Sequence, residues 1–140
     1  MEFLSYSEED TKNIAMKILK EHVNAKNLIL LYGDFGVGKT VFVKGIGKVL
    51  GVSEKSIKSP SYTLVREYYG DKKKLIHFDL YRIENNHDLE NLGFYEYLND
   101  LNSLVIVEWA QKVDLSLENA LKINFKILDD NLTRSIIFNS

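Results

Sequence analysis

The sequence predicts an α/β fold, in which a mostly parallel central sheet is flanked by helices and carries antiparallel hairpin strands. Two short apolar runs, residues 27–32 and 103–107, have the length and composition of buried strands and lie far apart in the chain. A glycine-rich segment, residues 33–40, joins the first run to a segment with helical periodicity. The 140 residues predict a single domain over residues 1–140, which buries about two thirds of the surface that its unfolded chain exposes.

The composition argues against several classes of partner. A net charge of −2 disfavours a large nucleic-acid footprint, because non-specific binding to phosphate backbones favours strongly basic domains. Any contact with RNA is therefore expected to be indirect. No stretch approaches the roughly 20 apolar residues of a membrane span, and residues 1–10 lack the basic start and apolar centre of a signal peptide. We expect a cytoplasmic protein with no membrane partner. The absence of cysteine excludes disulfides and thiolate zinc sites.

Residues 8–22 are predicted to form the first helix. Ser7 is a suitable N-cap with Asp10 three residues later, and apolar residues follow at helical spacing. Thr11 falls in the first turn, where its hydroxyl could reach a nucleotide base. An ordinary surface threonine is an equally good interpretation.

The segment Gly33-Asp-Phe-Gly-Val-Gly-Lys-Thr40 fits the Walker A pattern G-x-x-x-x-G-K-[ST], and it lies between a strand and a helix as that pattern requires. Its glycines permit a tight turn that points backbone N–H groups at phosphates, and the dipole of the following helix, residues 39–50, favours the same anions. Lys39 would contact the β- and γ-phosphates, and the Thr40 hydroxyl would bind Mg²⁺. The fold is therefore predicted to be that of a P-loop NTPase. The predicted nucleotide contacts in this region are Gly33, Asp34, Phe35, Gly36, Val37, Gly38, Lys39, Thr40 and Val41.

The segment after this helix contains Ser59-Pro-Ser-Tyr-Thr63. A loop in this position is often ordered by the γ-phosphate of a bound nucleotide, so the Ser61 hydroxyl is a candidate contact to the phosphate or the metal. An ordinary Ser-Pro turn is the alternative. Residues 62–69 and 74–81 then predict a β-hairpin, and residues 85–99 predict a helix interrupted at Gly93.

Two acidic residues are predicted at the ends of strands. Asp79 ends the second strand of the hairpin, and Glu108 follows an apolar run as in the Walker B pattern. Because ligands of open α/β sheets bind at the carboxyl ends of the strands, both acids are expected near the phosphates. We assign the metal to Thr40 and Glu108 and the attacking water to Asp79, although the order of the strands is open at this point.

Residues 121–128 and 132–138 predict a C-terminal hairpin. Arg134 lies in its second strand, where a contact with the nucleotide is one interpretation. A solvent-facing or ion-paired arginine is the favoured one.

The nucleotide is expected to be ATP, because the Asn-Lys-x-Asp run that recognises guanine is absent. A small-molecule kinase is an alternative, but the chain has only the three arginines Arg66, Arg82 and Arg134 for a phosphate-binding lid. Without an arginine finger, which increases the rate by about 10³–10⁵, hydrolysis is expected to be slow and controlled by a partner. A docking module with incidental hydrolysis is the other alternative.

The sequence resembles the TsaE family, formerly YjeE, of small bacterial ATPases in tRNA threonylcarbamoyladenosine synthesis. The residues that carry the resemblance are Gly33–Thr40, Ser59-Pro-Ser-Tyr-Thr63, His77-Phe-Asp-Leu-Tyr-Arg82, Leu92-Gly-Phe94 and Val107-Glu-Trp109. The resemblance implies binding of ATP and Mg²⁺, weak ATPase activity, and docking onto the TsaB–TsaD pair that transfers threonylcarbamoyl to adenosine 37 of tRNAs reading codons that begin with adenine. It also implies functional roles for Thr40, Asp79 and Glu108, a place for Trp109 beside the site, and nucleotide contacts from Thr11 and Arg134.

Two positions depart from the family pattern. Ser61 stands where threonine is expected, which keeps the hydroxyl, and Ala110 stands where proline is usual. Neither change removes a group with a predicted chemical role.

Overall fold

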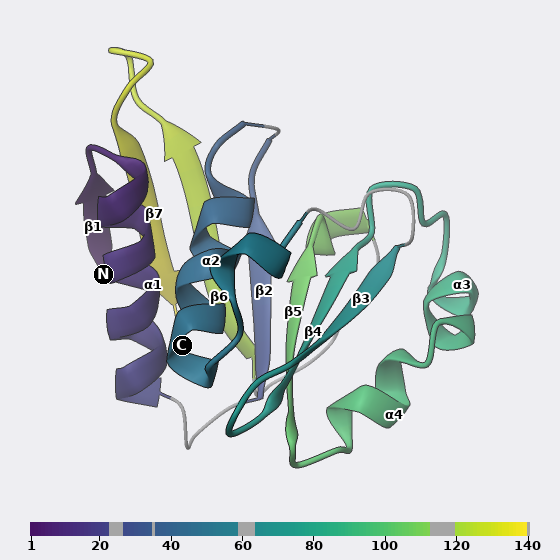
Figure 1. The fold of residues 1–140 in the computed structure, drawn as a ribbon. Helices are drawn as coiled ribbons and strands as arrows, with labels where there is room; N and C mark the ends of the chain where they lie inside the picture. The colour runs from purple at the N-terminus through teal and green to yellow at the C-terminus, as the bar shows by residue number, and fades with distance from the viewer. Residues whose placement is uncertain (23–26, 35, 59–63, 113–119, 140) are drawn as a thin grey trace.

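The computed structural model describes residues 1–22, 27–34, 36–58, 64–112 and 120–139. Its centre is one seven-stranded sheet in the order β1-β7-β6-β2-β5-β4-β3 (Figure 1). The strands are β1 (Glu2–Ser5), β2 (Leu28–Tyr32), β3 (Val65–Tyr69), β4 (Lys74–Asp79), β5 (Ser103–Glu108), β6 (Ala120–Ile127) and β7 (Arg134–Asn139).

The four central strands β6, β2, β5 and β4 pair in parallel, whereas the outer pairings β3–β4, β6–β7 and β1–β7 are antiparallel. The α/β fold and both hairpins are confirmed, but the expectation of a mostly parallel sheet holds for the centre alone. Strand β1 was not predicted. It has four residues without clear alternation, and it is held by pairing with a distant segment, for example Phe3 with Ile136.

Four helices and two short 3₁₀ turns complete the described fold. The helices are α1 (Glu8–His22), α2 (Lys39–Leu50), α3 (Asn86–Asn91) and α4 (Phe94–Leu98), and the turns are η1 (Glu54–Ser56) and η2 (Ala110–Lys112). The bounds of α1 and α2 are those predicted, and the Ser7 hydroxyl accepts the N–H of Asp10 at 3.0 Å as an N-cap. The helix expected over residues 85–99 is divided in two, because Gly93 adopts a left-handed conformation with φ of 78°.

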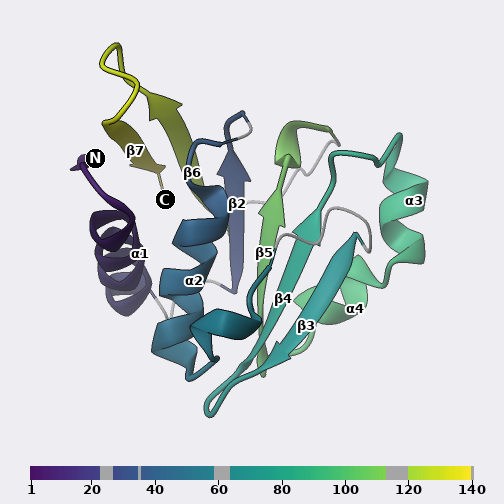
Figure 2. The same cartoon turned by 45° about the horizontal axis from the view of Figure 1, so that its top comes forward.

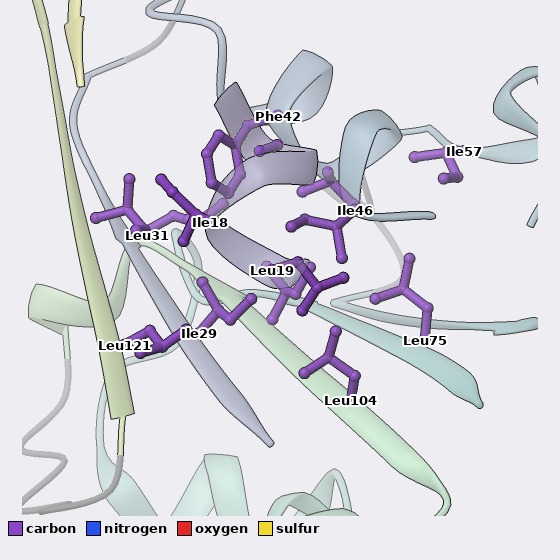
Figure 3. Close-up of a cluster of buried hydrophobic side chains, with 14 of the residues drawn as sticks. Ile18, Leu19, Ile29, Leu31, Phe42, Ile46, Ile57, Leu75, Leu104 and Leu121 are labelled. Carbon is purple, nitrogen blue, oxygen red and sulfur yellow. The ribbon is translucent and has the colours of Figure 1, made fainter. Parts of the chain in front are cut away.

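The helices lie on both faces of the sheet (Figures 1 and 2). On one face, α1 and α2 pack Ile18, Leu19, Phe42 and Ile46 against buried strand residues such as Ile29 (Figure 3). On the other face, α3 and α4 contribute one buried side chain each, Leu89 and Phe94, to a second cluster. None of the described helices combines the length and the apolar character that crossing a membrane requires.

Helices α1 and α2 approach each other closely at Gly45. A Cβ at this position would lie 2.6 Å from the carbonyl oxygen of Lys12 and 2.9 Å from the Cβ of Ala15. Real Cβ atoms do not occupy such distances, so the glycine sets the spacing between the helices. This spacing also places the first turn of α1 beside the start of α2.

Substitution of Gly45 by alanine should therefore lower the free energy of unfolding by about 1–3 kcal/mol, the usual loss on overpacking a core. The helix propensity of alanine offsets about 1 kcal/mol at most. Urea denaturation would measure the change. Gly47→Ala is a matched control on the same helix, because its Cβ would meet the movable tip of the Ile57 side chain. A Gly45→Ala protein as stable as the Gly47→Ala protein would contradict the prediction.

Candidate functional site

The carboxyl ends of three parallel strands meet at one edge of the sheet, the upper edge in Figure 1. The phosphate loop follows β2, Asp79 is the last residue of β4, and Glu108 is the last residue of β5. Asp79 and Glu108 are register partners on adjacent parallel strands, so their side chains leave the sheet on the same face. That face is the one covered by α1 and α2.

A cavity of about 370 Å³ lies at this edge. Its lining joins the start of α1, the phosphate loop, the ends of β4 and β5, and the turn before β7. The lining residues are Ser7, Glu8, Thr11, Gly36, Gly38, Lys39, Thr40, Val41, Asp79, Glu108, Trp109, Leu132 and Arg134.

The phosphate loop has the backbone of an anion cradle. Gly36 and Gly38 have φ angles of 74° and 100°, which other residues adopt only with strain, and a Cβ on either would point into open space. Gly38 immediately precedes α2, and no side chain caps the helix there. The first amides of α2 are therefore left for an acceptor that the described side chains do not supply.

Lys39 is buried at 5% exposure in the wall of the cavity. Its Nζ donates to the carbonyl oxygen of Gly33 at 2.6 Å and lies 4.2 Å from the centre of the Trp109 ring. Burial lowers the pKa of Lys39, while the nearby carboxylates of Glu108, Asp79 and Asp34 oppose that shift. The Gly33 carbonyl and the Trp109 ring thus hold the ammonium group at the phosphate loop, and a phosphate could replace them as its partner.

Asp79 is also buried, at 4% exposure. Its Oδ1 accepts the backbone N–H of Tyr81 at 3.0 Å, which fixes the orientation of the carboxyl group. Burial raises the pKa of Asp79, and the charge of Glu108 raises it further, while the Tyr81 hydrogen bond acts in the opposite direction. A carboxyl group with a raised pKa is a stronger proton acceptor than an exposed aspartate.

Glu108 has 4% exposure and is paired with a residue to which the sequence assigned no role. Its Oε2 lies 2.6 Å from Nε2 of His77, a fully buried residue of β4. His77 stands two residues before Asp79, so both side chains point to the same face of the sheet. The histidine lies in the motif that carried the family resemblance, but only the register of β4 with β5 places it beside Glu108.

The start of α1 and the β6–β7 turn also line the cavity. The Ser5 hydroxyl donates to the carbonyl of Ser7 at 2.9 Å, so the Thr11 hydroxyl, 2.6 Å away, is the donor to Ser5 and keeps its lone pairs for another partner. Arg134 donates to the carbonyls of Leu132 at 2.7 Å and Gly36 at 3.3 Å. The guanidinium therefore links the turn to the phosphate loop instead of facing solvent alone.

Asp130 fixes the conformation of that turn. Its carboxylate accepts the hydroxyl and the N–H of Thr133 together with the N–H of Leu132. These hydrogen bonds, the Thr133 hydroxyl first, lower the pKa of Asp130 to about 2. The turn that places Leu132 and Arg134 at the cavity is thus held by an ionised carboxylate.

Trp109 follows β5 directly and adopts a left-handed backbone with φ of 59°. Its ring packs against Tyr81 with 5.0 Å between ring centres, and the Lys39 ammonium lies 4.2 Å from the centre of the indole ring.

Most of the predicted site residues meet at the cavity. Its lining includes Thr11, Gly36, Gly38, Lys39, Thr40, Val41, Asp79, Glu108, Trp109 and Arg134. Gly33 and Asp34 stand beside it, and the Val37 side chain packs into the core. Phe35 and Ser61 lie outside the described residues. Ser7, Glu8 and Leu132 were missed as lining residues, because their position depends on the docking of α1 and of the last hairpin.

The charges of the lining residues determine whether the cavity can bind a negatively charged polyphosphate. In the part of the chain that the structure describes, the lining carries three carboxylates, Glu8, Asp79 and Glu108, and two cations, Lys39 and Arg134. A polyphosphate would be repelled by this balance unless a cation accompanied it. Among the described residues no cluster of three or more His, Asp or Glu side chains could hold a metal unaided. This donor set fits Mg²⁺, which usually takes one or two carboxylates together with phosphate oxygens and water.

The sequence matches the family model described as "Threonylcarbamoyl adenosine biosynthesis protein TsaE" over residues 5–136. A solved structure described as "Crystal structure of Bacillus subtilus YdiB" is similar, with a TM-score of 0.69 and 30% identity, covering 99% of this chain and 83% of that one. This likeness agrees with the predicted P-loop NTPase fold.

Several curated relatives carry the name "tRNA threonylcarbamoyladenosine biosynthesis protein TsaE". The Aquifex aeolicus protein is 37% identical over 138 residues, which are 98% of this chain and 95% of the relative. The Haemophilus influenzae protein is 37% identical over 120 residues, which are 85% of this chain and 75% of the relative. The Rickettsia conorii protein is 36% identical over 126 residues, which are 89% of this chain and 70% of the relative. The chain therefore belongs to the TsaE family of threonylcarbamoyl adenosine biosynthesis proteins.

Proposed function

We propose that this protein is a cytoplasmic, slowly hydrolysing ATPase that supports formation of the threonylcarbamoyl group on adenosine 37 of tRNAs reading codons that begin with adenine. It acts through the TsaB–TsaD complex and meets tRNA only indirectly. The observation that carries the proposal is that Thr40, Asp79 and Glu108, from three separate elements, line one cavity beside an uncapped helix start. The names of the relatives support the pathway.

The phosphate loop binds the substrate ATP in this proposal. The backbone amides from Gly36 into the first turn of α2 surround the β- and γ-phosphates, and Lys39 exchanges its bond to the Gly33 carbonyl for phosphate oxygens. Thr11 and Arg134 line the same cavity and are the proposed contacts of the nucleoside. The open lone pairs of the Thr11 hydroxyl suit an amino group such as that of adenine.

The two acids Glu108 and Asp79 have different roles in this proposal. Thr40 and Glu108 would hold the metal, and Mg²⁺ bound there would neutralise charge that develops on the terminal phosphate. Asp79 orients the attacking water and accepts its proton. The Tyr81 N–H occupies Oδ1 of Asp79, which leaves Oδ2 for the water, and the raised pKa of Asp79 improves its basicity.

Slow turnover follows from what the cavity lacks. Among the described residues that line it, Arg134 is the single arginine, and this guanidinium is engaged by the carbonyls of Leu132 and Gly36. No second lining arginine of the described chain is available to stabilise the transferred phosphate. Control by a partner complex therefore agrees with the site better than efficient hydrolysis by the chain alone.

The test combines binding with turnover. Immobilised protein should retain TsaB–TsaD more strongly with ATP than with ADP, and phosphate release from ATP should rise when the complex is present. Retention and turnover that are both indifferent to the nucleotide and the complex would refute the proposal. Phosphate release that equals ATP consumption excludes the kinase alternative, because a kinase moves the phosphate to another acceptor.

A further inference from the structure

His77 is a fully buried polar side chain with a defined partner. Its exposure is 0%, and its Nε2 lies 2.6 Å from Oε2 of Glu108, which is itself 4% exposed. A buried carboxylate requires hydrogen bonds, since an unpaired one is strongly destabilising. Among the described residues, His77 is the side chain that supplies this bond to Glu108.

The second ring nitrogen shows which atom carries the proton. Nδ1 of His77 is buried and has no hydrogen-bond partner among the described residues. A proton on Nδ1 would leave a buried donor unpaired, which costs about 1–3 kcal/mol. In the neutral imidazole, a proton on Nδ1 would also make Nε2 an acceptor and require a protonated Glu108 to donate to it. The geometry therefore assigns the proton to Nε2, which donates to the carboxylate of Glu108.

We propose that His77 is a positioning residue for Glu108. Its Nε2–H binds Oε2 of Glu108, which leaves Oε1 as the oxygen without a bond to His77, and Glu108 lines the cavity together with Thr40. This inference deepens the proposed function, since it depends on Glu108 holding the metal. A glutamate has three side-chain torsions, and the bond to His77 restricts them before any ligand arrives.

The restriction has a measurable consequence. Groups that orient a metal ligand usually contribute 10–100-fold to metal affinity, because an unrestrained ligand must be ordered when the metal binds. His77 and Asp79 lie on the same face of β4, and His77 binds the Glu108 side chain of β5. His77 therefore fixes the position of Glu108 relative to Asp79.

Two amide variants of His77 distinguish a hydrogen bond that positions Glu108 from a side chain that merely fills the space of the imidazole. In His77→Gln the amide nitrogen can stand near the position of Nε2, whereas in His77→Asn it can reach only the position of Nδ1. Binding of a non-hydrolysable ATP analogue would be measured by calorimetry over a range of Mg²⁺ concentrations and again with EDTA. His77→Gln should keep the native apparent Mg²⁺ affinity, and His77→Asn should weaken it about 10–100-fold. All three proteins should bind the analogue alike in EDTA.

Equal Mg²⁺ affinities in the two variants, whether native or lowered, would overturn the inference. A second measurement needs no variant at all. The nitrogen-15 spectrum of the imidazole in the nucleotide-free protein should show a proton on Nε2, and a bare Nε2 would equally overturn the inference.

Glu108→Gln distinguishes this inference from the proposed function. If Glu108→Gln binds Mg²⁺ with the analogue as tightly as the native protein does, the metal role of Glu108 fails, and the positioning role fails with it. If Glu108→Gln weakens Mg²⁺ binding and His77→Asn does not, only the role of His77 is refuted. If the roles of Glu108 and His77 are both confirmed, His77→Asn should lower the Mg²⁺ affinity no further in the Glu108→Gln background, because the two residues act as a unit.

Discussion

Lys39→Ala should lower the affinity for ATP in the presence of Mg²⁺ by about 30-fold to several thousand-fold. Loss of one member of a buried, hydrogen-bonded charge pair costs about 2–5 kcal/mol, and each 1.4 kcal/mol is a factor of ten. Lys39 is 5% exposed, and among the described lining residues it is one of two cations beside three carboxylates. Its removal leaves a cavity whose carboxylates outnumber Arg134 and repel the phosphates. Calorimetric titration with a non-hydrolysable ATP analogue would measure the loss.

Lys48→Ala is the matched control for this change. Lys48 lies on the same helix, but it is exposed and does not line the cavity. Its removal changes the net charge equally and should leave the affinity nearly unchanged. Native affinity in Lys39→Ala would mean that the phosphates of the nucleotide bind elsewhere, and the proposed function would have to be abandoned.

Asp79→Asn should lower the rate of ATP hydrolysis about 10²–10⁴-fold, the usual contribution of a general base. The amide keeps the size of the side chain, and its oxygen still accepts the Tyr81 N–H. ATP binding and ATP-dependent docking should therefore persist while turnover stops. A docking module with incidental hydrolysis would instead continue to support repeated rounds of tRNA modification in this variant. Phosphate release and multiple-turnover modification with TsaB–TsaD would measure the two outcomes.

The same substitution should make the nucleotide-free protein more stable at neutral pH. Burial raises the pKa of Asp79 in the folded state, so the folded protein binds this proton more tightly than the unfolded chain does. Stability is then lost as the pH rises from the ordinary value of an aspartate through the raised one, and the neutral amide avoids that loss. Thermal unfolding without Mg²⁺ would show a higher melting temperature for Asp79→Asn at pH 7. Asp129→Asn, at an exposed position of the β6–β7 turn, should change neither rate nor stability.

The sequence predicted those parts of the fold that depend on local pattern. Helices α1 and α2 were predicted with their observed bounds, because a capping serine, apolar periodicity and a terminal glycine mark their ends. Asp79 and Glu108 were expected at one edge, because parallel strands present their carboxyl ends together. These features need no knowledge of which strands are neighbours.

The missed features all depend on contacts between distant segments. Strand β1 exists through its pairing with β7, and Ser7 and Leu132 reach the cavity only after α1 and the last hairpin have docked. The pairing of His77 with Glu108 follows from a register that aligns Asp79 with Glu108 across two strands 29 positions apart in sequence. No local pattern in either strand encodes that alignment.

The position of Trp109 gives the protein an optical label of its own. It is the only tryptophan in the sequence, and its ring lies 4.2 Å from the ammonium group that the phosphates are expected to attract. Indole emission is sensitive to a nearby charge, so displacement of Lys39 toward a ligand would alter the fluorescence without any dye. The filling of the cavity could therefore be followed in real time in the native chain.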